Sequence, residues 1–277
     1  MLRKIILGTA NFTQSYGILS GKTCLRAKES GSILNKAFDK GVDTIDTAIG
    51  YGDITKVISS DTLRKFKIVT KISALDSKDE LIEKMNVYRG LSIYGLLVHD
   101  PANLTCIDER CLLEKLSFLK KAYGIEKMGV SAYDIREVSN FSRVYTPEIV
   151  QIPLNPLNQS FETPSFIEWI KDKKVEVHAR SLFLQGILLA SELPNELEPM
   201  RKEWNLVKKS LEHYQSPLHG LLFWAASKSW INNWVIGVSS LRDLDEIFEV
   251  SSLQKDITAT PIFESSTHLL ADPRNWK

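Results

Sequence analysis

Short apolar runs alternate with stretches of helical periodicity along the whole chain. The runs are rich in β-branched residues, and between them apolar residues recur every three or four positions. The predicted strands cover residues 4–7, 44–48, 67–71, 94–99, 127–131, 149–153, 175–179 and 234–239. This β-then-α alternation predicts parallel strands that are joined by crossover helices.

Eight such units in one chain favour a closed barrel over an open sheet. An open doubly wound sheet usually carries a glycine-rich phosphate loop after its first strand, whereas the first run here is followed by Gly8-Thr9-Ala10-Asn11. The chain has 277 residues, close to the ~250 that are usual for an eight-stranded barrel. We predict an α/β fold in which residues 1–277 form one domain, a (β/α)8 TIM barrel. Residues 188–233 carry two helical patterns and are expected to be an excursion from it.

Composition excludes several classes of function. Lys and Arg total 35 against 34 Asp and Glu, so the net charge favours neither nucleic acid nor an anionic membrane as a partner. No apolar run reaches the ~18 residues that a membrane span needs, and the N-terminus does not resemble a signal peptide. The three cysteines, Cys24, Cys106 and Cys111, fit no metal-ligand or redox spacing. We expect a cytoplasmic protein with reduced thiols and no metal site.

Ionisable residues cluster where the chemistry of a barrel is found, at the carboxyl ends of the strands. The second, third and fourth predicted strands end near Asp46, Lys71 and His99, and Tyr51 follows Asp46 closely. Singly, Asp46 could cap a helix, Lys71 could be a surface charge, and His99 could pair with Asp100. On three neighbouring strand ends, the four residues instead predict one cluster.

The four residue types together suit proton donation to a carbonyl oxygen. A phenol with a pKa of about 10 is a weak donor, and a nearby ammonium is expected to lower that pKa. A carboxylate would keep the ammonium charged and oriented, and an imidazole would orient the carbonyl group. Such a set predicts an acid that protonates the oxygen while a hydride reaches the carbon.

These residues resemble the signatures of the aldo-keto reductases. Residues 46–52 (DTAIGYG) resemble the D-T-A-x-x-Y-G motif of that family, and Lys71 and His99 match its strand-three lysine and strand-four histidine. The resemblance implies NADPH-dependent reduction of an aldehyde or ketone. Tyr51 would be the proton donor, with Asp46, Lys71 and His99 as the other catalytic residues.

The resemblance also implies a nicotinamide site around the rest of the barrel mouth. Ser131 and Gln151 match the residues that bind the carboxamide, and Arg180 stands where many members have a tyrosine that stacks on the nicotinamide. A planar guanidinium can also stack on a ring. The residues that would contact NADP(H), with NAD(H) not excluded, are Gly8, Thr9, Asp46, Ser131, Gln151, Arg180, Ser181, Leu182, Gly237, Ser239, Ser240 and Arg242.

Departures from the family pattern leave several properties open. Ala132 replaces the usual asparagine after the strand-five serine, and Asp243 falls near the position of the basic residue that often binds the 2′-phosphate. The implied partner is a small carbonyl substrate, with sugar-derived compounds as one candidate class. The protein would be a monomer or homodimer. Two alternatives remain: a subunit that senses the cofactor with little turnover, and an unrelated barrel that uses Lys71 as a Schiff base.

Overall fold

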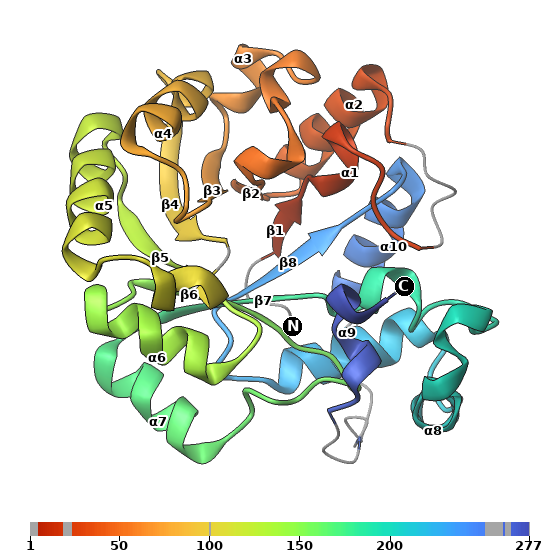
Figure 1. Cartoon of the computed structure of the whole chain (residues 1–277). Helices are drawn as coiled ribbons and strands as arrows, with labels where there is room; N and C mark the ends of the chain where they lie inside the picture. The colour runs from red at the N-terminus through yellow and green to blue at the C-terminus, as the bar shows by residue number, and fades with distance from the viewer. Residues whose placement is uncertain (1–4, 19–23, 100, 253–262, 264–266, 277) are drawn as a thin grey trace.

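The computed structural model describes residues 5–18, 24–99, 101–252, 263 and 267–276. Eight parallel strands follow one another around a closed barrel, and β8 pairs with β1 to complete it. The strands are β1 (Ile5–Gly8), β2 (Thr44–Asp46), β3 (Lys67–Ile72), β4 (Ser92–Val98), β5 (Lys127–Ser131), β6 (Ile149–Pro153), β7 (Glu176–Arg180) and β8 (Asn233–Gly237). The predicted (β/α)8 TIM barrel is confirmed (Figure 1).

Helices surround the barrel, as Figure 1 shows. They are α1 (Ala10–Thr13), α2 (Ala27–Asp39), α3 (Ser60–Leu63), α4 (Lys78–Met85), α5 (Glu109–Tyr123), α6 (Ile135–Val144), α7 (Pro164–Lys173), α8 (Arg201–Leu211), α9 (Pro217–Ser227) and α10 (Leu241–Ser252). The two helices predicted between the last two strands are α8 and α9. None of the described helices combines the length and apolarity that a membrane span requires.

The strand ends differ from the predictions by one or two residues. The predicted seventh strand began at Val175, but the amide of Val175 donates to the carbonyl of Ile170 and so completes the end of α7. The second strand ends at Asp46, and a short 3-10 turn, η1 (Ile49–Tyr51), follows it. The predicted residue Lys4 lies outside the described residues.

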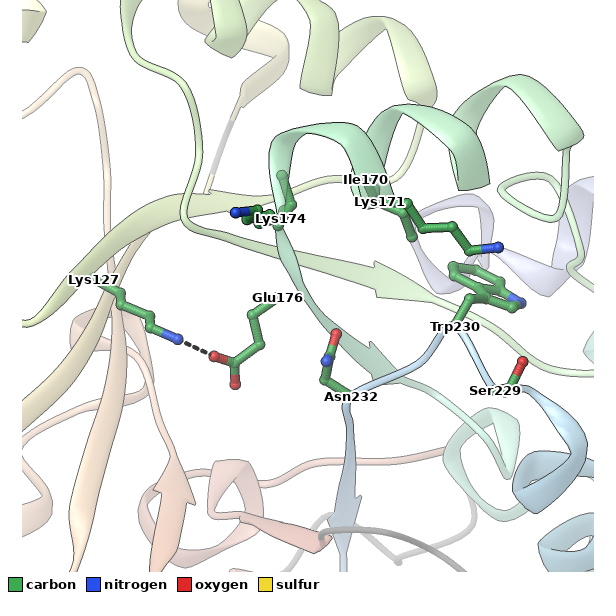
Figure 2. A pocket seen from close by; sticks show the side chains of 9 residues that line it. Lys127, Ile170, Lys171, Lys174, Glu176, Ser229, Trp230 and Asn232 are labelled. Atoms are coloured by element: carbon green, nitrogen blue, oxygen red, sulfur yellow. Dashed lines mark hydrogen bonds and ion pairs between the residues drawn. The ribbon is translucent and has the colours of Figure 1, made fainter.

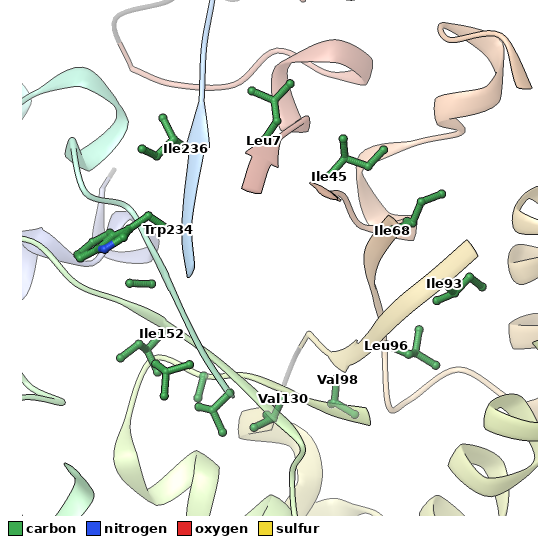
Figure 3. Close-up of a cluster of buried hydrophobic side chains, with 14 of the residues drawn as sticks. Leu7, Ile45, Ile68, Ile93, Leu96, Val98, Val130, Ile152, Trp234 and Ile236 are labelled. Atoms are coloured by element: carbon green, nitrogen blue, oxygen red, sulfur yellow. The ribbon is translucent and has the colours of Figure 1, made fainter. Parts of the chain in front are cut away.

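Alternation along the strands decides which side chains face the barrel interior. On β3, Ile68 packs in the large core between barrel and helices, whereas Val69 belongs to a separate inner cluster with Leu97 and Ile149. Figure 3 shows the outward set, including Ile68, Leu96 and Val130. Since side chains two residues apart share a face, Lys71 lies on the inward side with Val69.

A thin apolar layer therefore fills the middle of the barrel and leaves polar groups at both ends. Packing there is close: a Cβ at Gly129 would lie 1.8 Å from the carbonyl oxygen of Ile149, so only glycine fits. At the amino ends of the strands, Glu176 accepts hydrogen bonds from Tyr94 at 2.5 Å and Asn233 at 2.6 Å. Its Oε2 also pairs with Lys127 Nζ, and its Oε1 with His178 Nε2.

Candidate active site

A buried ion pair joins the second and third strands at their carboxyl ends. The Lys71 ammonium donates to Asp46 Oδ1 at 2.6 Å and to the carbonyl of Thr47 at 2.8 Å. Only 1% of the Lys71 side chain and 6% of the Asp46 side chain are exposed. Lys71 is therefore not a surface charge, and the Asp46 carboxylate pairs with Lys71 instead of capping a helix. Buried charges persist only when they are paired in this way.

The second oxygen of Asp46 is held from across the barrel. Gln151 Nε2 donates to Asp46 Oδ2 at 2.7 Å, and the Ser131 hydroxyl donates to Gln151 Oε1 at 3.2 Å. These three side chains are buried, as Lys71 is. A continuous chain of polar contacts thus runs from β5 through β6 and β2 to β3.

Tyr51 and His99 complete the predicted cluster. Their rings meet edge to face, with centroids 5.8 Å apart and an interplanar angle of 81°. The Lys71 ammonium lies 5.4 Å from the centre of the Tyr51 ring. Gly52, with a φ of 109°, turns the chain directly after Tyr51, a conformation that favours glycine. The structure therefore brings together all four residues that the sequence selected as catalytic.

The electrostatics of Tyr51 differ from the expectation. Desolvation raises the pKa of the Tyr51 phenol above its ordinary 10.0, and the negative charge of Asp46 raises it further. Arg180, not Lys71, is the neighbouring cation that opposes this rise. The expected lowering by Lys71 is wrong, because its charge is taken up by Asp46. Desolvation lowers the pKa of Lys71 itself, while Asp46 opposes that change.

Three residues near the mouth were not identified from the sequence: Tyr16, Tyr133 and Arg274. The Arg180 guanidinium lies 4.0 Å from the centre of the Tyr133 ring, and that of Arg274 lies 3.6 Å from it. Tyr16 interacts electrostatically with both Tyr51 and Arg180. Tyr16 and Tyr133 follow the ends of β1 and β5, a position that could have identified them. Arg274 carried no such signal.

The C-terminal segment reaches the mouth of the barrel through backbone contacts. Thr267 forms an antiparallel bridge with Asn158, and the amide of His268 donates to the carbonyl of Leu157 at 3.1 Å. The short helices η7 (Leu269–Ala271) and η8 (Pro273–Asn275) follow. This path brings Arg274 to Tyr133, although the two are far apart in sequence.

The residues predicted to hold the rest of the cofactor lie at the ends of β1, β7 and β8. Gly8 pairs with Gly237, and the Thr9 hydroxyl donates to the carbonyl of Asp46 at 3.0 Å. Ser181 has a φ of 64°, and its carbonyl accepts from Asn155 at 3.1 Å. Leu182 is buried in the outer core.

At the end of β8, Asp243 already engages the predicted phosphate contacts. It accepts from the amide of Ser239 and from the hydroxyl of Ser240, each at 2.8 Å. Arg242 is exposed and pairs with Glu246 at 2.8 Å. A phosphate at this position would therefore meet a carboxylate before it met a free cation.

A hollow of about 390 Å³ lies at the opposite end of the barrel. Figure 2 shows its lining, in which Lys127 and Glu176 pair beside Asn232 and Trp230. Lys127 and Glu176 begin β5 and β7, and Asn232 directly precedes β8, so the hollow lies at the amino ends of the strands. In barrels of this kind that end usually serves stability, and the chemistry lies at the other end. Within the described ranges, no three His, Cys, Asp or Glu side chains are grouped so as to hold a metal.

Comparisons with known proteins agree with this geometry. Residues 4–266 match the model of the aldo/keto reductase family. The holo form of the aldo-keto reductase AKR11C1 from Bacillus halodurans superposes with a TM-score of 0.71 at 14% identity, over 91% of this chain and 88% of that one. Its apo form gives 0.69 at 16% identity, over 93% of each chain.

A Pseudomonas aeruginosa protein assigned to the same family gives a TM-score of 0.65 at 16% identity, over 91% of this chain and 90% of that one. At such identities the likeness supports the fold. None of the curated proteins matches the sequence. The chain belongs to the aldo-keto reductase family, whose general activity is NAD(P)H-dependent carbonyl reduction.

Proposed function

We propose that this protein reduces an aldehyde or ketone to an alcohol, with Tyr51 as the proton donor. The observation that carries the proposal is the position of Tyr51: its ring lies against His99 and over the ammonium of the buried Lys71–Asp46 pair. At neutral pH the phenol carries the proton that the reaction requires, as an ordinary tyrosine does, and its raised pKa makes it a weaker acid than such a tyrosine. A neutral phenol is the form that can donate.

Each residue of the cluster has a separate duty in this proposal. Tyr51 passes its hydroxyl proton to the carbonyl oxygen, and His99 orients that oxygen by a hydrogen bond. Lys71 and Asp46 hold the floor of the site rigid, since each is bonded to a partner on another strand or loop. The nicotinamide cofactor, when bound, supplies the hydride to the carbonyl carbon.

The donors at the mouth fit a nicotinamide carboxamide. That group has one acceptor and two donors, and Ser131 and Gln151 offer a hydroxyl and an amide on adjacent strands. We propose that these two side chains bind the carboxamide. The remainder of the cofactor would lie along the ends of β1, β7 and β8 and contact the other predicted residues: Gly8, Thr9, Arg180, Ser181, Leu182, Gly237, Ser239, Ser240 and Arg242.

The preference between the two nicotinamide cofactors depends on the end of β8. Among the described residues there, Arg242 is the cation that could support a 2′-phosphate, and it is already paired with Glu246. Asp243 places a negative charge beside Ser239 and Ser240. We propose that the site accepts NADP(H), as the family resemblance implies, and NAD(H) as well.

The broader predictions follow from family membership. An unrelated barrel with a Schiff base on Lys71 is wrong, because the chain matches the aldo/keto reductase family over residues 4–266. We propose a small carbonyl compound as the partner and one domain over residues 1–277. The cytoplasmic location and the monomeric or homodimeric state remain predictions.

Replacement of Tyr51 by Phe tests the function directly. Reduction of simple aldehydes by the purified protein, followed by cofactor consumption, should fall at least about a hundredfold, because removal of a general acid costs that much. Cofactor binding, followed by fluorescence, should stay near the wild-type value. Tyr123→Phe is the control, since that hydroxyl donates to the carbonyl of Ile82 on the helical layer.

Three outcomes separate the possibilities. Loss of turnover with retained binding in Tyr51→Phe supports the proposal. Full activity in that variant would remove Tyr51 as the donor. Tight cofactor binding by the wild type without turnover of any carbonyl compound would instead identify a subunit that senses the cofactor.

A further inference from the structure

Arg180 carries a positive charge that the described part of the protein does not neutralise. It is the last residue of β7 and is half-buried. Within the described residues, Arg180 makes one side-chain hydrogen bond, from Nη1 to the Ser181 hydroxyl at 3.4 Å, which is long. No carboxylate of those residues pairs with Arg180. A guanidinium has five N–H donors, so most of its donors are available to a ligand.

Arg274, which touches the same aromatic ring, shows the opposite arrangement. It donates to both oxygens of Asp272, at distances from 2.6 to 3.0 Å, and lies 3.7 Å from Glu137. Two carboxylates therefore balance Arg274, whereas Arg180 has only the face of Tyr133. Among the described residues, Arg274 thus has carboxylate partners of its own, and Arg180 has none.

The Arg180 guanidinium, which lacks a carboxylate partner in the described structure, lies near the proposed proton donor. Arg180 acts electrostatically on Tyr51, Tyr16 and Lys71. Lys71 cannot attract an anion itself, because it is enclosed and bonded to Asp46. Arg180 is therefore the cation that a bound substrate would meet at this side of the mouth. An anionic group on the substrate would supply the counter-charge that the described side chains do not give Arg180.

We propose that Arg180 binds an oxyanion, a carboxylate or phosphate group, on the carbonyl substrate. This inference rests on the proposed function and gives it a substrate class. The centre of the Arg180 guanidinium lies over the Tyr133 ring, 4.0 Å from the ring centre. The N–H edge of a guanidinium matches two oxygens of an anionic group. Stacking on a nicotinamide would use a face of the guanidinium and leaves the same edge available.

Matched pairs of substrates test the inference. 4-Carboxybenzaldehyde and its methyl ester differ in a carboxylate, and glyceraldehyde 3-phosphate and glyceraldehyde differ in a phosphate. The quantity to measure is the ratio of kcat/KM for the charged member to that for the neutral member. Arg180→Gln should lower this ratio by roughly 10- to 100-fold, the worth of a charge-assisted hydrogen bond. The pair that responds identifies the anionic group.

Two further variants make the result specific. Arg180→Lys keeps the charge but loses the fork of donors, so it should restore part of the preference. Arg136→Gln is the matched control, since Arg136 is 88% exposed and pairs with Asp134 on the outer helix α6. It should leave the ratio at the wild-type value. Cofactor affinity is measured for every variant.

Other outcomes overturn the inference. No preference for charged substrates in the wild type, or an equal loss for both members of each pair in Arg180→Gln, would show that Arg180 does not recognise an anion. A loss that follows weakened cofactor affinity would assign Arg180 to the cofactor alone. If the wild type reduces no aldehyde, the proposed function fails, and calorimetric binding of 4-(hydroxymethyl)benzoate to wild type and Arg180→Gln still decides the inference.

Discussion

Lys71 and Asp46 form an ion pair at 2.6 Å inside the barrel, with almost no exposure of either side chain. A buried ion pair of this kind adds little to folding stability when compared with apolar residues of the same shape. Loss of one partner, however, leaves an uncompensated buried charge and lowers the stability strongly. The pair is therefore expected to affect both the stability of the fold and the activity of the proposed site, and mutation can separate the two effects.

Asp46→Asn should destabilise the protein by about 3 to 5 kcal/mol, because it leaves the buried Lys71 ammonium without a counter-charge. The double variant Asp46→Asn/Lys71→Met should regain much of that stability but none of the activity. Denaturant unfolding and aldehyde turnover measure the two effects. Asp61→Asn is the control, since Asp61 is 92% exposed in its pair with Arg64 and should cost less than about 1 kcal/mol. A double variant as unstable as the single one would contradict this account.

Tyr51 should stay protonated beyond the range of an ordinary phenol. Desolvation and Asp46 both raise its pKa above 10.0, so a pH rise through about 10 ionises exposed tyrosines first. Spectrophotometric titration of the cofactor-free wild type and of Tyr51→Phe should therefore coincide up to that pH. An extra tyrosinate in the wild type near neutral pH would mean that the phenol is acidic, as the sequence alone suggested.

Asp243→Asn should shift the cofactor preference toward NADPH by about five- to tenfold, the effect of removing one nearby like charge at a surface. Asp243 accepts from Ser239 with Oδ2 and from Ser240 with Oδ1, so asparagine keeps one of these two acceptors. The backbone amide of residue 243 still donates to the Ser240 hydroxyl at the start of α10. Dissociation constants for NADPH and NADH provide the ratio. Asp245→Asn on the same helix, where Asp245 pairs with Lys36, should leave it unchanged. An unaltered ratio in Asp243→Asn would place the 2′-phosphate elsewhere.

Glu176→Gln should destabilise the protein by about 2 to 3 kcal/mol near pH 7, because Glu176 accepts from Tyr94 and Asn233 and pairs with Lys127 and His178. These donors hold the pKa of Glu176 well below its ordinary 4.5, although burial alone would raise it. A lowered folded-state pKa gives stability that is complete above the unfolded value and is lost as pH falls below it.

The difference in unfolding free energy between wild type and Glu176→Gln should therefore be constant above about pH 5 and shrink below about pH 4. Urea unfolding across this range measures it. Glu114→Gln, at an exposed pair with Arg110, provides the comparison with a surface carboxylate. A difference that grows on acidification would reverse the sign of the linkage and contradict the assigned network.

Much of the site was accessible from the sequence because a barrel places chemistry at strand ends. Once the strands ending near Asp46, Lys71 and His99 were identified, parallel pairing alone predicted their convergence. The contact between Gln151 and Asp46 was not predicted, since it crosses the interior between strands that are not neighbours. The pKa of Tyr51 was predicted in the wrong direction, because burial and the capture of Lys71 by Asp46 cannot be read from residue types.

The order of apolar and polar positions by itself determined the eight parallel strands, the barrel and the four side chains at its mouth, because periodicity and strand polarity are local properties of the chain. Only the tertiary structure decided which charges are balanced. Arg274 reaches Tyr133 from the far end of the sequence and brings its own carboxylate, while Arg180 has none in the described region. Charge compensation depends on distances through space, and those are set by packing rather than by order along the chain.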